Sequence, residues 1–220
     1  MEISIVITCH NYARYLARAI RSAINQNYSR KKYEILVVND ASTDETRDVM
    51  DSFMGYIRPI HLDKNIGLSE ARNIGIKRAI GKYVVNVDAD DYIGENLLMI
   101  ESAFLEQHIE WDAVSCDYDL IDDEGNVLET KDGNEYPIAC GIMFHKQQLF
   151  EIGLYDEKFK YQEEREMRIR FEKKYKIHRL ELPLYRYRRH DRNITNNHKE
   201  MEKYNKSLIL KHGKLEIDIK

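Results

Sequence analysis

Three aspartates follow a short run of β-branched apolar residues and are the side chains of this sequence best suited to chemistry. The run Val84–Val87 is typical of a buried strand, and Asp88, Asp90 and Asp91 come directly after it. Carboxylates this close together repel, whereas a divalent cation such as Mg2+ or Mn2+ prefers hard oxygen ligands. The cluster therefore predicts a metal site that also holds substrate phosphates. The alternative is a polar turn in which an aspartate caps the next helix.

Polar residues also follow the first two predicted strands. The first apolar run leads into Thr8, His10 and Asn11, and the run Tyr33–Val38 leads into Asp40. Parallel strands share a direction, so these ends should meet the aspartates at the edge of the sheet where open α/β folds bind ligands. Taken alone, a histidine is more often a structural hydrogen-bonding residue and an aspartate a helix cap. Their convergence on one edge is what indicates a site.

Alternating strands and helices are expected to position these residues. Apolar residues recur at helical spacing between the strands, and the predicted helices cover residues 12–25, 45–54 and 70–80. We expect Ser69 to cap the third helix and Gly81 to end it. The short connections predict an α/β protein with a mostly parallel sheet covered by helices on both faces.

The second half of the chain has a less regular pattern. It contains shorter predicted strands, two of which cover Lys176–Leu180 and Leu184–Tyr187, and a helix is expected to begin near Tyr161. No linker rich in Pro, Gly or Ser separates the halves. We therefore predict one domain over residues 1–220, with a nucleotide-binding front half and a substrate-binding back half.

Composition excludes several classes of function. The 220 residues are 43% hydrophobic and 33% charged, which is typical of a globular protein with a core. The net charge of −4 argues against strong binding to nucleic acid. Three cysteines without CxxC spacing indicate a reducing compartment, and no signal peptide or membrane span is visible. We expect a cytoplasmic protein and leave open a peripheral contact with the inner face of a membrane.

The usual phosphate-binding loops are absent from the sequence. Neither GxGxxG nor GxxxxGK[ST] follows a predicted strand, which argues against NAD, FAD and P-loop nucleotide sites. A phosphate-bearing ligand would therefore need a metal and basic side chains. The candidates are Arg72, Arg188, Arg189 and His190.

Four segments in this order resemble the family 2 glycosyltransferases, which have the Rossmann-like GT-A fold. They are Ser4–Tyr12, Ile35–Asp44, Asn65–Gly75 and Val87–Asp91. The resemblance is strong over residues 3–92 and continues more weakly through 141–144, 161–170 and 187–190. It implies an inverting hexosyl- or N-acetylhexosaminyltransferase whose donor is a nucleotide-diphosphate sugar, usually UDP-linked. The acceptor would be a hydroxyl of a glycan, a lipid-linked molecule or another compound, bound by residues 93–220, while residues 1–92 bind the donor.

The resemblance also implies roles for individual residues. The nucleotide-binding candidates are Thr8, His10, Asn11, Asp40, Arg72, Asp88 and Arg189. The candidates for holding Mn2+ or Mg2+ are Asp90, Asp88 and His190. Glu164 takes the position of the catalytic base, and Glu163 that of an acceptor or structural contact. Arg189 and His190 are expected in a C-terminal lid over the diphosphate, followed by the polar loop Asn193–Asn197 and a terminal helix.

Other interpretations remain open at this point. A sugar nucleotidyltransferase would need a glycine-rich basic loop after the first strand, and the segment Thr8–Ala13 contains no glycine. A non-catalytic homologue that binds sugar nucleotide is the second alternative. Locally, Glu163 and Glu164 could lie on a surface helix with Glu–Arg pairs, and Arg189 in an exposed basic turn.

Overall fold

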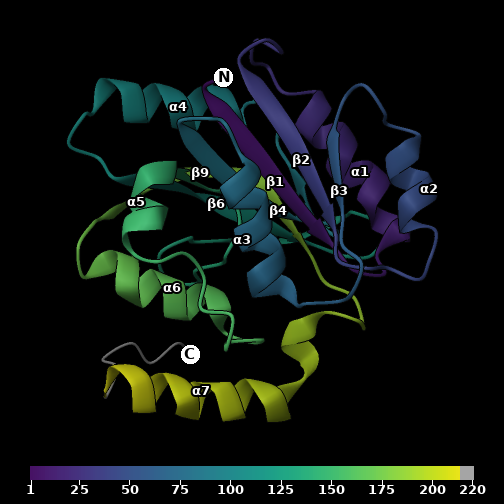
Figure 1. The fold of residues 1–220 in the computed structure, drawn as a ribbon. Coiled ribbons are helices and arrows are strands. Elements are labelled where there is room, and N and C mark those ends of the chain that lie inside the picture. The colour runs from purple at the N-terminus through teal and green to yellow at the C-terminus, as the bar shows by residue number, and fades with distance from the viewer. Residues whose placement is uncertain (214–220) are drawn as a thin grey trace.

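The structure, a computed structural model, describes residues 1–213; residues 214–220 of the predicted domain lie outside the described part. The front half contains β1 (Ile3–Cys9), α1 (Ala13–Ile24), β2 (Tyr33–Asn39), α2 (Thr46–Asp51), β3 (Arg58–His61), α3 (Leu68–Arg78) and β4 (Tyr83–Asp88) (Figure 1). The second half contains β5 (Tyr92–Ile93), α4 (Leu97–Gln107), β6 (Ala113–Ile121), β7 (Val127–Lys131), β8 (Ile142–His145), α5 (Lys146–Glu151), α6 (Glu163–Glu172), β9 (Ile177–Arg188), the 3-10 turn η1 (Ile194–Asn196) and α7 (His198–His212).

One sheet runs through both halves. Among the described residues it has nine strands in the order β3-β2-β1-β4-β8-β6-β9-β5, with β7 added on β6. The first four strands of this order are parallel, and β8 joins them antiparallel to β4. Thr8 lies opposite Val38 on one side and Asp88 on the other, so the ends of β1, β2 and β4 meet at one edge. The prediction of an α/β fold with a mostly parallel sheet is confirmed.

Helices cover both faces of the sheet. One apolar cluster joins the sheet to α1, α2 and α4, and the other joins it to α3, α5 and α6. Gly75 allows α3 to lie close to the sheet, because a Cβ there would stand 2.3 Å from Val6 Cγ1. In Figure 1, α7 lies below α6, away from the sheet. It packs through the fully buried Leu208 and through Tyr204, whose ring is 5.9 Å from that of Phe159.

Two predictions about the ends of α3 were wrong, each because a contact with a distant segment decided the outcome. Ser69 is not a cap: α3 begins at Leu68, and the Ser69 hydroxyl donates to the carbonyl of Phe159 at 2.5 Å. The helix ends at Arg78, so Gly81 does not terminate it. A Cβ at Gly81 would stand 2.6 Å from the carbonyl carbon of Ile3, and this close approach to β1 explains the glycine.

The two strands predicted near the C-terminal end form the single strand β9. It pairs with β6 in parallel from Ile177 to Arg188. Cys116, Asp117 and Tyr118 of β6 lie opposite Leu180, Pro183 and Tyr185, so the extra residues of the irregularity are on β9, where the two predicted strands were separated. Within residues 1–213, no helix combines the length and apolar composition that crossing a bilayer requires.

Candidate active site

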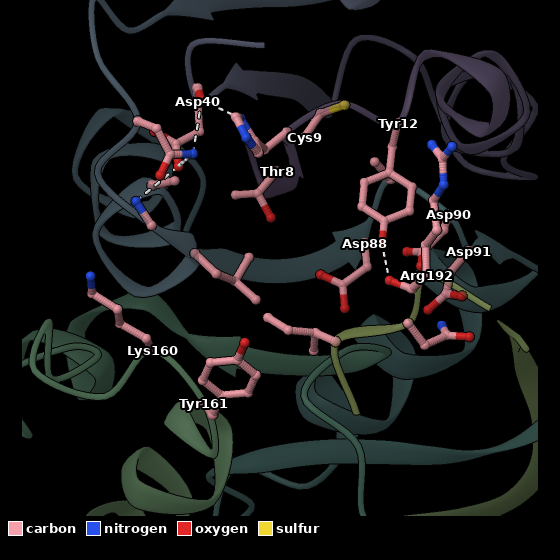
Figure 2. A pocket seen from close by; sticks show the side chains of 18 of the residues that line it. Thr8, Cys9, Tyr12, Asp40, Asp88, Asp90, Asp91, Lys160, Tyr161 and Arg192 are labelled. Atoms are coloured by element: carbon pink, nitrogen blue, oxygen red, sulfur yellow. Dashed lines mark hydrogen bonds between the residues drawn. The ribbon is translucent and has the colours of Figure 1, made fainter. Parts of the chain in front are cut away.

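A cavity of about 410 Å³ opens where the parallel strands β1, β2 and β4 end. Its lining includes Thr8, Asp40 and Asp88 from these strand ends, and Lys160 and Arg192 from the second half. In Figure 2, Asp40 and Asp90 lie on opposite sides of the cavity with Thr8 between them. The polar residues predicted to converge on one edge therefore do surround a ligand-sized space.

Two of the three residues predicted at the end of the first strand line this cavity. Thr8 is buried, and its hydroxyl has no hydrogen-bond partner among the described residues, so a ligand could use it. His10 Nδ1 lies 2.8 Å from the carbonyl oxygen of Asp40, which fixes the ring at the cavity wall. Asn11 is not among the cavity-lining residues. It has a φ of 59°, and its side-chain oxygen accepts from the backbone of Thr43 at 2.7 Å, so it ties the two loops together.

Asp40 is a buried cavity residue whose carboxylate already has protein partners. Oδ1 accepts from the Ile66 amide at 2.8 Å, and Oδ2 accepts from the Gly67 amide and the Asn65 side chain at 2.9 and 3.0 Å. A carboxylate has about four lone-pair sites, so Oδ1 keeps one for a ligand. Asp40 thus shapes the turn before α3 and can still accept from a base.

The three aspartates after β4 have different environments. Asp88 Oδ1 accepts from Arg72 Nη2 at 2.7 Å, and Asp90 Oδ2 lies 3.0 Å from His190 Nε2. Asp91 is buried and accepts from the Tyr185 hydroxyl at 2.7 Å and the Arg188 amide at 2.8 Å. Burial, followed by the charges of Asp90 and Asp88, raises the pKa of Asp91. Asp91 is therefore structural, while Asp88 and Asp90 present oxygens to the cavity.

His190 is held over Asp90 by aromatic contacts. Its ring stacks on that of Tyr15 with centroids 4.9 Å apart and meets Tyr12 edge-on at 5.6 Å. The Arg192 amide donates to Nδ1 at 3.1 Å, so Nε2 carries the proton that faces Asp90. The C-terminal segment and the end of β4 are thus joined at this point.

The donor atoms at this junction fit a divalent cation. Asp88 and Asp90 line the cavity with carboxylate oxygens, and Nε2 of His190 lies 3.0 Å from Asp90 Oδ2 and would become a metal ligand on losing its proton. Over the described part of the chain, no three His, Cys, Asp or Glu side chains are grouped closely enough to hold a metal by themselves. Mg2+ commonly takes one or two carboxylates and completes its shell with waters and substrate phosphates. The arrangement fits a metal that binds together with a phosphate ligand.

The two glutamates at the start of α6 differ in exposure. Glu163 is buried against Arg72, with Oε1 2.7 Å from Nη1. Burial and the neighbouring Glu164 raise the pKa of Glu163 to about 8, although Arg72 opposes this shift. Glu164 is half-buried and lines a smaller pocket beside the cavity, together with Asp88 and Tyr161. Of the two glutamates, Glu163 is paired with Arg72, whereas Glu164 lines this pocket and has no ion pair among residues 1–213.

A model of the family described as "Glycosyl transferase family 2" matches residues 4–179. The chain belongs to glycosyltransferase family 2. This confirms the resemblance found in the four ordered segments.

Individual relatives support the same placement. Glycosyltransferase GlyG of Streptococcus pneumoniae serotype 4 is 32% identical over 151 residues, which cover 67% of this chain and 46% of the relative. The poly(ribitol-phosphate) beta-N-acetylglucosaminyltransferase TarS of Staphylococcus aureus is 30% identical over 111 residues, which cover 49% of this chain and 19% of TarS. The chain therefore spans less than half the length of either curated relative.

Solved structures share the fold at lower identity. S. aureus TarS 1-349 in complex with UDP-GlcNAc has a TM-score of 0.81 at 18% identity. The alignment covers 100% of this chain and 68% of the TarS chain. The mannosyltransferase PcManGT of Pyrobaculum calidifontis, in complex with GDP-Man and Mn2+, has a TM-score of 0.76 at 16% identity. That alignment covers 96% of this chain and 63% of the PcManGT chain. These likenesses confirm the predicted GT-A fold.

In this member of glycosyltransferase family 2, two predicted basic residues lie elsewhere than expected. Arg189 is exposed and lines none of the described pockets; its amide donates to the Ile121 carbonyl at 2.8 Å. Arg72 is buried; it lines the smaller pocket with Glu163 and Glu164 but not the main cavity. Sequence reasoning missed Lys160 and Arg192, which do line it. Their only signal was a basic residue near each weaker motif, and several other residues share that property.

Proposed function

We propose that this chain transfers a sugar from a UDP-linked donor to an acceptor hydroxyl, with inversion at the anomeric carbon. The observation that carries the proposal is one cavity that combines Asp40, Asp88 and Asp90 with the cations Lys160 and Arg192. The acid pair of α6 lies beside it in a pocket that shares Asp88 with the cavity. TarS, whose structures contain UDP and UDP-GlcNAc, has the same fold, and this supports UDP as the first nucleotide to test.

The donor would occupy the main cavity. The remaining lone pair of Asp40 Oδ1 can accept the ring N–H of uracil, and His10 forms the wall beside it. The diphosphate would lie near Lys160 and Arg192, which approach the cavity from different segments, as Figure 2 shows. Two cations at a diphosphate stabilise the negative charge that develops as the nucleotide leaves. Arg189 keeps a predicted nucleotide role only if its segment moves.

Asp90 and His190, with Asp88, would hold a divalent metal at the end of β4. A bound Mn2+ or Mg2+ would supply Lewis-acid stabilisation of the leaving diphosphate. The protein contributes the placement: the Tyr15 ring stacks on His190, and the Asp90 carbonyl accepts from Arg188 Nε at 2.9 Å. Both contacts hold the donor atoms in position before any ligand binds.

Glu164 would take the proton from the acceptor hydroxyl. It lies at the start of α6, where unpaired backbone N–H groups stabilise a carboxylate. Attack from this side, opposite to the leaving diphosphate, inverts the anomeric carbon in a single displacement with an oxocarbenium-like transition state. Residues 1–92 would then bind the base and hold the metal, and residues 93–220 would bind the acceptor and also supply Lys160, His190 and Arg192 to the donor site, within one GT-A domain.

The test is a donor screen that identifies the product. The protein is incubated with UDP-, GDP- and dTDP-sugars, with and without Mn2+, and nucleoside diphosphate and pyrophosphate are both quantified. Release of UDP from UDP-GlcNAc, with an inverted sugar product by NMR, is the expected result. Pyrophosphate release would instead indicate a nucleotidyltransferase, and binding without any release a non-catalytic sugar-nucleotide-binding protein.

A further inference from the structure

Arg72 joins the two acidic groups of the candidate site. Its side chain is 1% exposed, with Nη2 2.7 Å from Asp88 Oδ1 and Nη1 2.7 Å from Glu163 Oε1. Asp88 ends β4 in the donor half, whereas Glu163 begins α6 in the second half, 91 residues away from Arg72. One guanidinium therefore bridges the end of the parallel sheet and the helix that carries the acid pair.

The surroundings of Arg72 hold this bridge in one orientation. The guanidinium lies over the Tyr155 ring at 5.5 Å from its centroid. Asn73 of the same helix accepts from the Tyr155 amide and donates to its carbonyl, both at 2.9 Å. Ser69, one turn earlier, donates to Phe159. The buried polar face of α3 therefore docks the whole segment that leads into α6.

We propose that Arg72 is a positioning residue that sets the distance between the donor-binding acid Asp88 and the Glu163–Glu164 pair. This inference rests on the proposed function, because it assigns the bridge to the transfer reaction. The two amino groups of a guanidinium can bond two carboxylates at once in a fixed plane, which a lysine ammonium on a flexible stem cannot reproduce. Through Glu163, the bridge fixes the first turn of α6 and so the place of Glu164.

The geometry separates this role from direct nucleotide binding. Both amino groups of Arg72 are engaged by Asp88 and Glu163, and Arg72 does not line the main cavity. Replacing a residue that binds the nucleotide should lower the affinity of the protein for the donor. Replacing a positioning residue should lower turnover instead. A misplacement of about 1 Å in a reacting group can cost roughly 10²-fold in rate. We therefore expect kcat to fall by about this factor while donor affinity is kept.

Three variants make the test. Arg72→Lys keeps the charge but can reach only one acid, and Arg72→Ala opens the space of a guanidinium. Arg58→Lys is the matched control, because Arg58 also pairs with a buried carboxylate, that of Glu34, on strands β3 and β2 outside the cavity lining. For each variant the measurements are the UDP dissociation constant by calorimetry, KM and kcat for UDP release from UDP-GlcNAc, and the melting temperature.

The expected result is a split between binding and turnover. Arg72→Lys should bind UDP within about threefold of wild type and lose about 10²-fold in kcat. Millimolar guanidinium should restore part of the turnover of Arg72→Ala and leave Arg58→Lys unchanged. Should Arg72→Ala fail to fold, Arg72→Lys gives the same split by itself.

Two outcomes would overturn this inference without contradicting the proposed function. Wild-type kcat in Arg72→Lys would show that the bridge does not position the acids. A loss of UDP affinity equal to the loss of kcat would show that Arg72 binds the nucleotide directly. A wild-type protein that releases no nucleoside diphosphate from any sugar nucleotide would instead contradict the proposed function, and the positioning role would fall with it.

Discussion

Adjacent residues of the same type can have different roles when their environments differ. Glu163 has a side chain only 6% exposed, its carboxyl group faces Arg72, and its pKa is raised to about 8 by burial and by Glu164. Glu164 is half-buried at the wall of the second pocket. On a helix the two side chains point about 100° apart, so they cannot both reach one acceptor atom. This difference supports Glu164 as the base and Glu163 as the anchor of the bridge.

Replacing Glu164 by glutamine should abolish most of the turnover. The amide keeps the shape but cannot take a proton, and removal of a general base typically costs 10² to 10⁴-fold in rate. The UDP dissociation constant should stay the same, because Glu164 lies outside the main cavity lining. Glu172→Gln is the control: Glu172 is on the same helix, where it pairs with Arg168 at 2.8 Å. Turnover above about a tenth of wild type would exclude Glu164 as the base.

Glu101 of α4 is a fully buried carboxyl group away from the site. Neither carboxyl oxygen has a hydrogen-bond partner among the described residues. The Cys116 thiol is the polar group that favours the ionised form of Glu101, and its effect is smaller than that of burial. Burial raises the pKa of Glu101 well above that of an unfolded glutamate. The folded state therefore keeps the proton at pH values where the unfolded state has lost it, and stability must fall as pH rises through this window.

Glu101→Gln should remove this pH dependence. Below about pH 4, where the unfolded glutamate is also protonated, the contribution is fully present, and the variant and wild type should have similar free energies of unfolding. Above that pH the wild type loses up to about 1.4 kcal/mol per pH unit until the folded pKa is passed, and the glutamine does not. Urea denaturation at pH 4, 6 and 8 measures the difference. Parallel curves for the two proteins would show that Glu101 is ionised in the fold.

At the scale of elements, α3 connects the parallel sheet to the acid pair. One face carries Gly75 against the sheet, and the polar face carries Ser69, Arg72 and Asn73 toward the segment before α6. The distance between helix and sheet therefore decides where Arg72 lies. A single residue without a side chain sets that distance.

Gly75→Ala should destabilise the protein although alanine is the better helix former. Alanine is favoured over glycine by about 1 kcal/mol in a helix interior, but its Cβ would stand 2.3 Å from Val6 Cγ1. Overpacking typically costs 1–3 kcal/mol, and a contact this short places the cost at about 2–3 kcal/mol. After the gain in helix propensity we expect a net loss of roughly 1–2 kcal/mol and a melting temperature lower by roughly 2–8 °C. The double variant Val6→Ala/Gly75→Ala should lose less than the sum of the single variants. A more stable Gly75→Ala would contradict the close packing.

The segment after β9 is the second element that matters for the site. Arg188 is fixed, because its guanidinium donates to the carbonyls of Asp122 and Asp123 at 2.9 and 2.7 Å. Beyond it, the Tyr12 hydroxyl donates to the Arg192 carbonyl at 2.8 Å, and most of residues 191–197 are exposed. A lid over the diphosphate can therefore include Arg192 but not Arg188. The existence of this lid stays a prediction.

Limited trypsin digestion tests the lid. UDP with Mn2+ should slow cleavage after Arg192, because a segment closed over the diphosphate is ordered and less accessible. Cleavage after Lys31, in the exposed loop between α1 and β2, should be unaffected and serves as the control. Equal cleavage rates at Arg192 with and without ligand would exclude a lid in this segment.

At the scale of the whole molecule, the site lies where the two halves meet. β8 extends the parallel strands antiparallel to β4, and β6 and β9 follow it, so the two halves share one sheet. The metal candidates Asp90 and His190 come from segments 100 residues apart. A ligand that contacts both should stabilise the entire fold, since it binds the native state and not the unfolded chain.

UDP together with Mn2+ should raise the melting temperature, and Asp90→Asn should remove the Mn2+-dependent part. At 100 times the dissociation constant a ligand adds about 2.7 kcal/mol, which corresponds to roughly 5–11 °C for a domain of this size. Asp191→Asn is the control, because it removes an exposed carboxylate next to His190. An equal effect of UDP with Mn2+ and with EDTA would exclude metal-dependent binding.

The sequence by itself determined the front half of the fold and the family. Short apolar runs specify the strands, and segments with apolar residues at helical spacing specify the helices between them. Because the strands are parallel, their ends bring Thr8, Asp40 and Asp88 to one edge of the sheet. The same reasoning could not place a helix cap such as Ser69, because a tertiary partner, the Phe159 carbonyl, was available to its hydroxyl. Local chemistry predicts what a side chain can do, and distant contacts decide which option is taken.

Only the tertiary structure decided the roles of the charged residues. Asp91 looks like Asp88 and Asp90 in sequence, yet Tyr185 and the Arg188 amide bury it. Arg72 was expected at the nucleotide and instead bridges Asp88 to an acid 91 residues away. The physical reason is that a buried charge requires partners, and its partners come from segments whose proximity is set by packing of the whole chain.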